Sequence, residues 1–292
     1  MASIKSLVVI VGETASGKSA LAIALARKFG GEIIAADSRT VYRGMDIGTA
    51  KPSPEERSGV PHHLIDVVSP EQTFTAADFK RSAEQLIDQI HDRKHVPIVV
   101  GGTGLYVDSL LYDYKFLPAP STELRARLSN MSIEELHAEI QHKGLRLPSN
   151  ERNPRHLARV IETNGHQSYK HDLREHTLLL GLKVEDRSVL EQRIRTRVEV
   201  MIHQGLKQEV KDLIQQYGTD IEAFRAPGYQ AMVRHLQGEL SLEDAREAFV
   251  RGDLALAKRQ RTWFKRNKSI HWISEQAEAV DLLTTFLNKY HI

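Results

Sequence analysis

The chain has 292 residues, of which 41% are hydrophobic and 27% are charged, and its formal net charge is +2. This composition is ordinary for a globular protein and excludes a disordered or low-complexity chain. Cysteine is absent, which excludes a disulfide framework, a thiolate metal site and a cysteine nucleophile. The longest apolar runs are too short to span a bilayer and no signal peptide is visible, so we expect a cytoplasmic protein without membrane association.

The first predicted element is a buried parallel strand at residues 7–11, an apolar run that ends at Gly12. A helix follows and stops at two glycines, and its predicted apolar face consists of Leu21, Ala22, Leu25, Ala26 and Phe29. A second apolar run, residues 33–36, ends in Asp37. This strand–loop–helix–strand order predicts a right-handed crossover with a ligand site at the carboxyl ends of the strands.

Further strands are predicted at residues 63–68, 96–100 and 178–184. Between residues 116 and 176 the pattern changes to short amphipathic helices broken by proline and glycine, and after residue 184 it is helical throughout. We therefore predict an α/β fold: a P-loop NTPase-like parallel sheet flanked by helices, with a mostly helical inserted domain. The predicted core is residues 1–115 and 177–292, and the insertion is residues 116–176.

The stretch VGETASGKSA at residues 11–20 has a glycine, four residues of any type and then Gly-Lys-Ser, between a strand and a helix. In this arrangement the loop amides and the helix N-terminus point at an anion. Lys18 would neutralise phosphate oxygens, and the Ser19 hydroxyl would complete the ligand shell of Mg²⁺. The alternative is a glycine-rich turn without chemical consequence. The predicted phosphate-binding residues are Gly12, Glu13, Thr14, Ala15, Ser16, Gly17, Lys18 and Ser19.

From the loop alone, a P-loop kinase of a nucleoside or small metabolite is the default hypothesis. Four further blocks favour another chemistry: DSRTVYRGMDIGTAKP at 37–52, PHHLIDVVSP at 61–70, VGGTGLY at 100–106 and AKRQRTWF at 257–264. Together with the loop they closely resemble the tRNA dimethylallyltransferase family, also called tRNA isopentenyltransferases or IPP transferases, over residues 10–263. The resemblance implies transfer of a dimethylallyl group from its diphosphate to the exocyclic N6 amine of the adenosine immediately 3′ of the anticodon, with release of diphosphate.

An adenine exocyclic amine is a poor nucleophile, so a positioned base that takes its proton would help the reaction. The resemblance assigns this role to Asp37, whereas a metal ligand or a helix cap is the alternative from the residues alone. At the other end of the reaction, fixed cations would stabilise the leaving oxygens. The resemblance assigns Arg197 to the diphosphate beside Lys18, with Arg193 as a companion, and the alternative for both arginines is a surface ion pair with a glutamate such as Glu191.

A tRNA substrate requires clustered positive charge on loops and helices. If the C-terminal block is helical, Lys258, Arg261 and Lys265 share one face and would present charge to RNA, although such runs usually mean a solvated face. Tyr42, Tyr106 and Tyr229 are candidates for stacking on a displaced base, with ordinary packing as the alternative. The predicted tRNA-contacting residues are Lys258 and Arg261, from the C-terminal helical face, together with a set that follows from the resemblance: Asp37, Ser38, Arg39, Thr40, Thr103, Arg125, Arg155, Arg159 and Arg225.

The sequence also departs from the resembled pattern. The segment Gly252–Leu256 reads GDLAL, where the family usually has basic residues, which puts some RNA contacts in doubt. His62 and His63 do not predict a metal site, because adjacent side chains rarely converge on one ion and no further ligands follow. A tRNA-binding protein without catalysis is a third hypothesis. The resemblance implies a monomer with tRNA and dimethylallyl diphosphate as its partners, and the sequence does not say which tRNAs are recognised.

Overall fold

The protein, represented by a computed structural model, is described at residues 5–57, 59–118, 120–166, 169 and 171–290. The chain divides into two compact units, Met1–Leu111 with Arg174–Ile292, and Tyr112–Leu173. The predicted insertion, residues 116–176, overlaps the second unit but is displaced a few residues toward the C-terminus. No helix in the described part of the chain combines the length and apolarity needed to cross a membrane.

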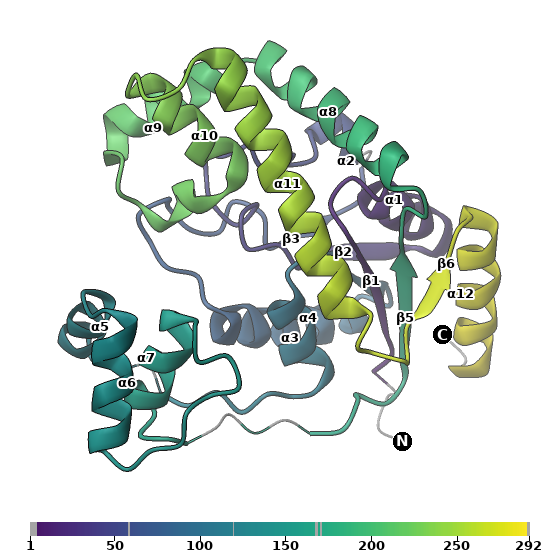
Figure 1. Cartoon of the computed structure of the whole chain (residues 1–292). Helices are drawn as coiled ribbons and strands as arrows, with labels where there is room; N and C mark the ends of the chain where they lie inside the picture. Colours follow the sequence, from purple (N-terminus) through teal and green to yellow (C-terminus); the bar gives the residue numbers. More distant parts are fainter. Residues whose placement is uncertain (1–4, 58, 119, 167–168, 170, 291–292) are drawn as a thin grey trace. The chain divides into compact units, whose positions relative to one another are not determined.

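The first unit contains a six-stranded sheet in the order β3-β2-β4-β1-β5-β6 (Figure 1). All five strand pairings are parallel. Its strands are β1 (Leu7–Gly12), β2 (Gly31–Ala35), β3 (His62–His63), β4 (Val96–Gly101), β5 (Thr177–Leu182) and β6 (His271–Ile273). The central strands are continuous apolar runs because helices cover the sheet on both faces.

Two helices share one buried cluster with the sheet: α1 (Lys18–Phe29) and α12 (Gln276–Tyr290) pack against residues such as Val8, Ile10 and Leu180. Because side chains alternate along a strand, the neighbouring positions face the other layer. That layer is formed by α3 (Ala76–Asp92), α4 (Gly104–Leu111) and the end of α11 (Leu242–Phe264), which contact β1, β2 and β4. The 23-residue α11 therefore reaches from the sheet into the C-terminal helices (Figure 1).

A second core of this unit lies among the C-terminal helices. It joins α8 (Arg187–His203), α9 (Leu206–Tyr217), the short η1 (Glu222–Arg225), α10 (Pro227–Leu236) and α11. The segment that follows β2 contributes Val41, Tyr42 and Met45 to the same cluster. The C-terminal helices therefore anchor the loop that begins with Asp37.

The second unit is helical, as predicted for the insertion. It contains α5 (Thr122–Ser129), α6 (Ile133–His142) and α7 (Pro154–Glu162). Each helix begins after a side-chain cap, from Ser121, Ser132 and Asn153 respectively. A small core fills the space between them: Leu128, Leu136, Ile140, Leu157 and Ile161.

Most predicted strands are present within one or two residues, but two expectations were wrong. The run 63–68 is a two-residue strand, His62–His63, followed by turns, because Leu64 and Asp66 have left-handed φ angles of 60° and 58° that end the pairing. The short helix α2 (Pro54–Arg57) precedes it. The chain after residue 184 is not wholly helical either, since β6 adds a three-residue edge strand to β5. Such a short edge strand carries too little pattern to be recognised in the sequence.

Candidate active site

The loop predicted to bind phosphate, residues 12–19, connects the end of β1 to the start of α1. Gly17 has φ 91°, a conformation that disfavours any side chain, and the helix begins at the next residue. The loop thereby presents the free amides of the helix N-terminus at the carboxyl edge of the sheet. The Ser16 hydroxyl is buried without a hydrogen-bond partner among the described residues, so the loop holds a polar group that a ligand can satisfy.

Lys18 is half-buried, and its Nζ donates to the carbonyl oxygen of Glu13 at 3.3 Å. The pKa of Lys18 is lowered from 10.5 to about 8: burial is the main cause, the charge of Arg197 adds to it, and the charges of Asp37 and Glu13 oppose it. These interactions place four charged residues from the loop, the tip of β2 and α8 within electrostatic range of one another. An anion bound beside Lys18 would restore its ordinary pKa.

The Glu13 side chain does not face the loop's interior. It is buried, and its carboxylate accepts two hydrogen bonds from Arg261 at 2.8 and 2.7 Å and one from the amide of Val184 at 3.1 Å. This geometry departs from the prediction that Arg261 contacts tRNA. Its guanidinium is committed to Glu13, since a buried carboxylate requires a paired cation. Arg261 therefore ties α11 to the loop.

Asp37 lies two residues beyond the end of β2, at the same edge of the sheet as the loop. Its Oδ1 accepts hydrogen bonds from the amides of Arg39 at 2.8 Å and Thr40 at 3.4 Å, which fixes the carboxylate in a local turn. Its Oδ2 has no hydrogen-bond partner among the described residues. The neighbouring Ser38 donates its amide to Oγ1 of Thr103 at 3.0 Å, so the turn before α4 holds this segment in place.

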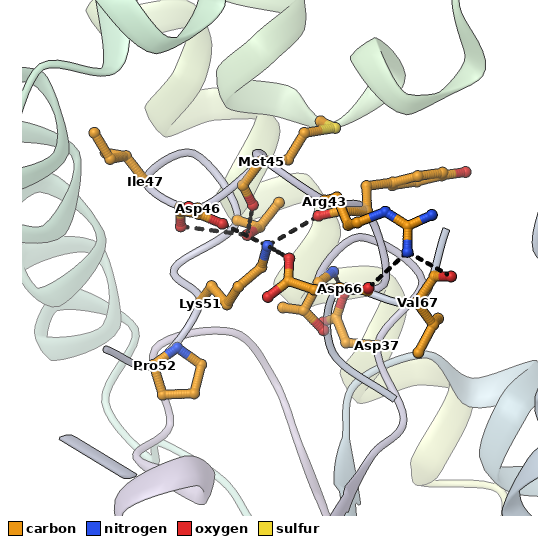
Figure 2. A network of polar contacts seen from close by, with 12 residues as sticks. Asp37, Arg43, Met45, Asp46, Ile47, Lys51, Pro52, Asp66 and Val67 are labelled. Carbon is orange, nitrogen blue, oxygen red and sulfur yellow. Dashed lines mark hydrogen bonds and ion pairs between the residues drawn. The ribbon is translucent and has the colours of Figure 1, made fainter. Parts of the chain in front are cut away.

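A buried lysine holds the segment that Asp37 begins (Figure 2). Lys51 has only 3% of its side chain exposed, and its Nζ contacts Asp46 and Asp66 at 2.5 Å each and the carbonyl oxygen of Tyr42 at 2.9 Å. Arg43 reaches the carbonyl oxygens of Asp66 and Val67, both at 3.3 Å. These contacts link the loop after β2 to the turns after β3, so the position of Asp37 depends on residues well beyond it.

Side chains from α9 and α10 also hold the loop after β2 in place. Glu209 accepts hydrogen bonds from the amides of Asp46, Ile47 and Gly48 at 2.9, 2.8 and 3.1 Å. The fully buried Tyr229 donates its hydroxyl to the same carboxylate at 2.5 Å. The sequence pattern did not select Lys51 or Glu209 as site residues, because their role depends on loop groups that are distant in the chain.

The three tyrosines considered for base stacking are packed in the interior. Tyr42, Tyr106 and Tyr229 are between 0% and 4% exposed. Tyr106 stacks on Phe79 and donates its hydroxyl to the carbonyl oxygen of Phe74 at 2.7 Å. Ordinary packing, the alternative, is therefore the interpretation that the structure supports.

The two arginines of α8 have different surroundings. Arg197 is largely buried, its Nη2 lies 2.5 Å from Oδ2 of Asp253, and its Nε is buried without a hydrogen-bond partner among the described residues. Arg193 is exposed. The surface ion pair with Glu191, which was the alternative interpretation of Arg193 and Arg197, is made by Arg195, which also contacts Glu247. Of the two predicted residues, Arg197 is the one placed near Lys18.

A cleft of about 670 Å³ opens beside Asp37. One side comes from Asp37, Ser38, Arg39 and Thr103, and the other side comes from α10 and α11. The lining residues that the sequence analysis did not select as site residues include Arg234, Arg251, Arg259, Gln260 and Trp263. The predicted Arg225 lines it too, paired with Glu222 at 2.8 Å.

Gln260 joins the parts of this site. Its Oε1 accepts the amide of Thr14 at 2.8 Å, and its Nε2 donates to the carbonyl oxygen of Gly102 at 3.1 Å. Gly102 must lack a side chain, because a Cβ there would overlap the Gln260 amide. Gln260 is buried, and its side-chain amide holds the loop and the glycine turn together.

The remaining predicted tRNA contacts are not among the residues that line this cleft. Lys258 is exposed on α11. In the second unit Arg155 is exposed, while Arg125 and Arg159 lie 3.5 and 3.1 Å from Glu162. Glu162 therefore offsets part of the positive charge predicted for this unit.

Potential metal ligands do not form a cluster. Among the described residues, no three or more histidine and carboxylate side chains gather in a way that could hold an ion. His62 Nδ1 contacts the carbonyl oxygen of Val60, and His63 Nε2 contacts the carboxylate of Glu32. Ser19 is exposed at the first turn of α1, which leaves its hydroxyl accessible to a cation brought by a phosphorylated ligand.

The parallel sheet, the glycine-rich loop and the adjacent carboxylate define an α/β enzyme core with a site at the carboxyl ends of its strands. The chain belongs to the IPP transferase family, because the family model of that description matches residues 40–267. The family named from the sequence resemblance is therefore confirmed.

Individual relatives agree with this assignment. The chain is 40% identical to a tRNA dimethylallyltransferase of Geobacillus thermodenitrificans, over 92% of this chain and 90% of the relative. It is 42% identical to a tRNA dimethylallyltransferase of Alkaliphilus metalliredigens, over 92% and 91%.

Solved structures are similar as well. A full-length tRNA isopentenylpyrophosphate transferase from Bacillus halodurans has a TM-score of 0.76 and 34% identity, with 98% of each chain covered. A eukaryotic dimethylallyltransferase acting on tRNA also has a TM-score of 0.76, with 26% identity over 92% of this chain and 73% of that one. The predicted α/β fold with flanking helices is thus confirmed.

Proposed function

We propose that this protein transfers a dimethylallyl group from dimethylallyl diphosphate to the N6 amine of the adenosine immediately 3′ of the anticodon in tRNA. One observation supports this assignment above the others. Asp37, with one oxygen held by backbone amides and the other unpaired among the described residues, lines a cleft within electrostatic range of Lys18. A carboxylate that can accept a proton and a cation that can bind an anion are therefore close to each other.

At the diphosphate end, the allylic C–O bond breaks and negative charge accumulates on the leaving oxygens. The loop amides, Lys18 and Arg197 stabilise that charge, in a site where burial strengthens electrostatic interactions. Mg²⁺, when bound by diphosphate oxygens and the accessible hydroxyl of Ser19, would supply further positive charge. The buried Ser16 hydroxyl and Nε of Arg197 both offer hydrogen bonds that the described residues leave unmade.

At the acceptor end, the N6 nitrogen forms a bond to the allylic carbon as the C–O bond breaks. The proton that leaves N6 passes to Oδ2 of Asp37. The contacts of Oδ1 with the amides of Arg39 and Thr40 keep the carboxylate oriented during this step. General base catalysis of this kind contributes roughly 10²- to 10⁴-fold to a rate.

The acceptor RNA is held by charge and by polar groups of the cleft. Ser38, Arg39, Thr103 and Arg225 line the cleft and are in position to contact the nucleotide chain. Basic residues outside the cleft add phosphate contacts, which position RNA without reading its bases. Those assigned here are Lys258, Arg125, Arg155 and Arg159. A monomer working in the cytoplasm remains our expectation.

The test is transfer of label from dimethylallyl diphosphate to an anticodon stem-loop RNA. The expected product carries the label on the target adenine, and an RNA without that adenine should remain unlabelled. Incubation with γ-labelled ATP and the same RNA or with nucleosides should give no phosphorylated product. Phosphoryl transfer in place of prenyl transfer would contradict the proposal and revive the kinase hypothesis. Full transfer activity in Asp37→Ala would contradict the assigned base.

A further inference from the structure

Arg197 and Asp253 form a nearly buried ion pair that the function above does not use. The two atoms, Nη2 and Oδ2, are 2.5 Å apart, and the Asp253 side chain is only 6% exposed. Burial raises the pKa of Asp253, while the neighbouring Arg197 opposes that rise. A buried carboxylate with a single cationic partner stays charged mainly because of that partner.

The rest of the Arg197 guanidinium remains available. A guanidinium has five N–H donors, and among the described residues this side chain donates one hydrogen bond, to Asp253. Nε is buried and unpartnered within the same part of the chain. Leaving such a donor unsatisfied costs free energy, which an anionic ligand can recover. Asp253 therefore orients the Arg197 guanidinium but leaves most of its N–H donors without a partner in the part of the chain that the structure describes.

Asp253 also adds a negative charge next to the group that is to receive an anion. It lies on α11, within the segment Gly252–Leu256 where the sequence departs from the pattern of the family it resembles. The same helix supplies Gln260 and Arg261, which hold the glycine-rich loop. The helix thus supports the phosphate side of the site at three points, and of these three residues only Asp253 opposes an incoming anion by its charge.

We propose that Asp253 restrains diphosphate binding by holding Arg197 and offsetting its charge, so that the diphosphate product is released readily. This inference rests on the proposed function, since it takes Arg197 to serve the diphosphate. Asp253 is a positioning residue in this scheme, because it acts on the ligand through Arg197. The diphosphate engages the free side of the guanidinium, and the Asp253 carboxylate keeps that interaction from becoming too strong.

The test is the dissociation constant of inorganic diphosphate for the full chain, measured by calorimetry at fixed pH and salt. Asp253→Asn keeps the size of the side chain and removes its charge. We expect binding about tenfold tighter than wild type, and stronger product inhibition of label transfer, because one unit of opposing charge is gone. A merely structural role predicts weaker binding. Unchanged or weaker binding in Asp253→Asn would overturn the inference.

Further variants isolate the mechanism. Glu243→Gln removes the same charge from the exposed start of α11, where Glu243 has 68% of its side chain accessible, and should leave diphosphate affinity unchanged. In an Arg197→Gln background, Asp253→Asn should have little effect, because its influence passes through the arginine. A full tenfold effect in that background would overturn the inference.

Two controls separate this inference from the proposed function. If wild type binds diphosphate and Arg197→Gln weakens the binding, the function stands, and the result for Asp253→Asn decides the inference alone. If wild type fails to bind diphosphate, both are rejected. Should Asp253→Asn not fold, as judged by thermal unfolding, Asp253→Ser removes the charge with a smaller side chain and must tighten binding in the same direction.

Discussion

The two ends of strand β2 carry contrasting carboxylates. Glu32 lies near the amino end of the strand and Asp37 follows its carboxyl end. Glu32 is buried and fully engaged: Arg93 donates two hydrogen bonds at 2.8 Å each, and His63 and His95 contact it at 2.6 and 2.7 Å. Arg93 is the main reason that the pKa of Glu32 is lowered to about 2.

The groups at the carboxyl end are left incomplete. Asp37 has one carboxylate oxygen without a hydrogen-bond partner among the described residues. Three further polar groups at this end are buried and lack a partner within the described part of the chain: the hydroxyls of Ser16 and Thr40 and Nε of Arg197. Lys18 has a lowered pKa because protein groups do not compensate for its burial. Buried polar clusters with all their hydrogen bonds made stabilise a fold, whereas buried groups that lack partners and have shifted pKa values are typical of functional sites. The carboxylate at the amino end of β2 therefore has a structural role, and the one after its carboxyl end belongs to the candidate site.

The largest expected effect comes from Asp37→Asn. The side-chain amide oxygen of this variant can still accept from the amides of Arg39 and Thr40, but the side chain cannot take a proton from N6. We expect label transfer to the stem-loop RNA to fall about 10²- to 10⁴-fold with diphosphate affinity nearly unchanged. Asp88→Asn, which alters an exposed ion pair with Lys5, is the matched control. Retention of more than a tenth of the activity in Asp37→Asn would argue against the base.

At the other end of the strand, Glu32→Gln should lower stability and spare the chemistry. Removing the charge weakens the hydrogen bonds of a buried carboxylate, but Arg93 and His95 are nearly half exposed and water can solvate them. We therefore expect a loss on the order of 1 to 2 kcal/mol in the free energy of unfolding. Activity per folded molecule should be unchanged. Because the folded pKa of Glu32 is depressed, wild-type stability should also fall as pH drops from 4.5 toward 2, and the variant should lack that contribution. Denaturant unfolding across this range measures both.

Lys18→Met tests how the affinity for dimethylallyl diphosphate depends on pH. Burial lowers the folded pKa of Lys18 to about 8; the charge of Arg197 also lowers it, while the charges of Asp37 and Glu13 raise it. The charged form binds the anion, so affinity for dimethylallyl diphosphate should fall as pH rises above about 8. Lys18→Met should bind roughly tenfold to a hundredfold more weakly at pH 7, corresponding to one lost charge-assisted hydrogen bond.

The ratio of wild-type to Lys18→Met affinity removes the ligand's own ionisation, which is common to both proteins. That ratio should decrease between pH 7 and pH 9. A constant ratio would show that Lys18 does not change its charge in this range, or that it does not contact the ligand.

The smallest effect is expected from Arg193→Gln. Arg193 is exposed on α8, and charges in that environment contribute little to binding. Diphosphate affinity should change less than about twofold, compared with a loss of about tenfold or more in Arg197→Gln. Equal losses in the two variants would restore the original prediction that both arginines serve the diphosphate.

Much of the fold was predictable because its signals are local. The apolar runs of β1, β2, β4 and β5 are bounded by glycine or polar residues and were placed within one or two residues. The edge strand β6 and the turns at Leu64 and Asp66 were missed. Edge pairing and left-handed turns depend on the neighbouring segments more than on the residues themselves.

The residues of the candidate site likewise include some that the sequence could predict and some that it could not. Gly12–Ser19 and Asp37 stand beside strand ends, so their sequence neighbours reveal their place. Arg261 was assigned to the RNA because its spacing on a helix suggested an exposed face, yet Glu13, far away in the chain, accepts hydrogen bonds from two of its nitrogens. Lys51, Glu209 and Gln260 escaped selection for the same reason, since backbone amides and carbonyls of loops supply their partners.

The sequence by itself determined the glycine-rich loop, the carboxylate after β2 and the family. The residues that define each of these features occur in short motifs with a fixed spacing. Only the tertiary structure decided which charged side chains form ion pairs within the protein and which can still bind a ligand. Whether a charged group is free depends on the burial and hydrogen bonds that distant segments impose on it, and side-chain identity alone does not carry that information.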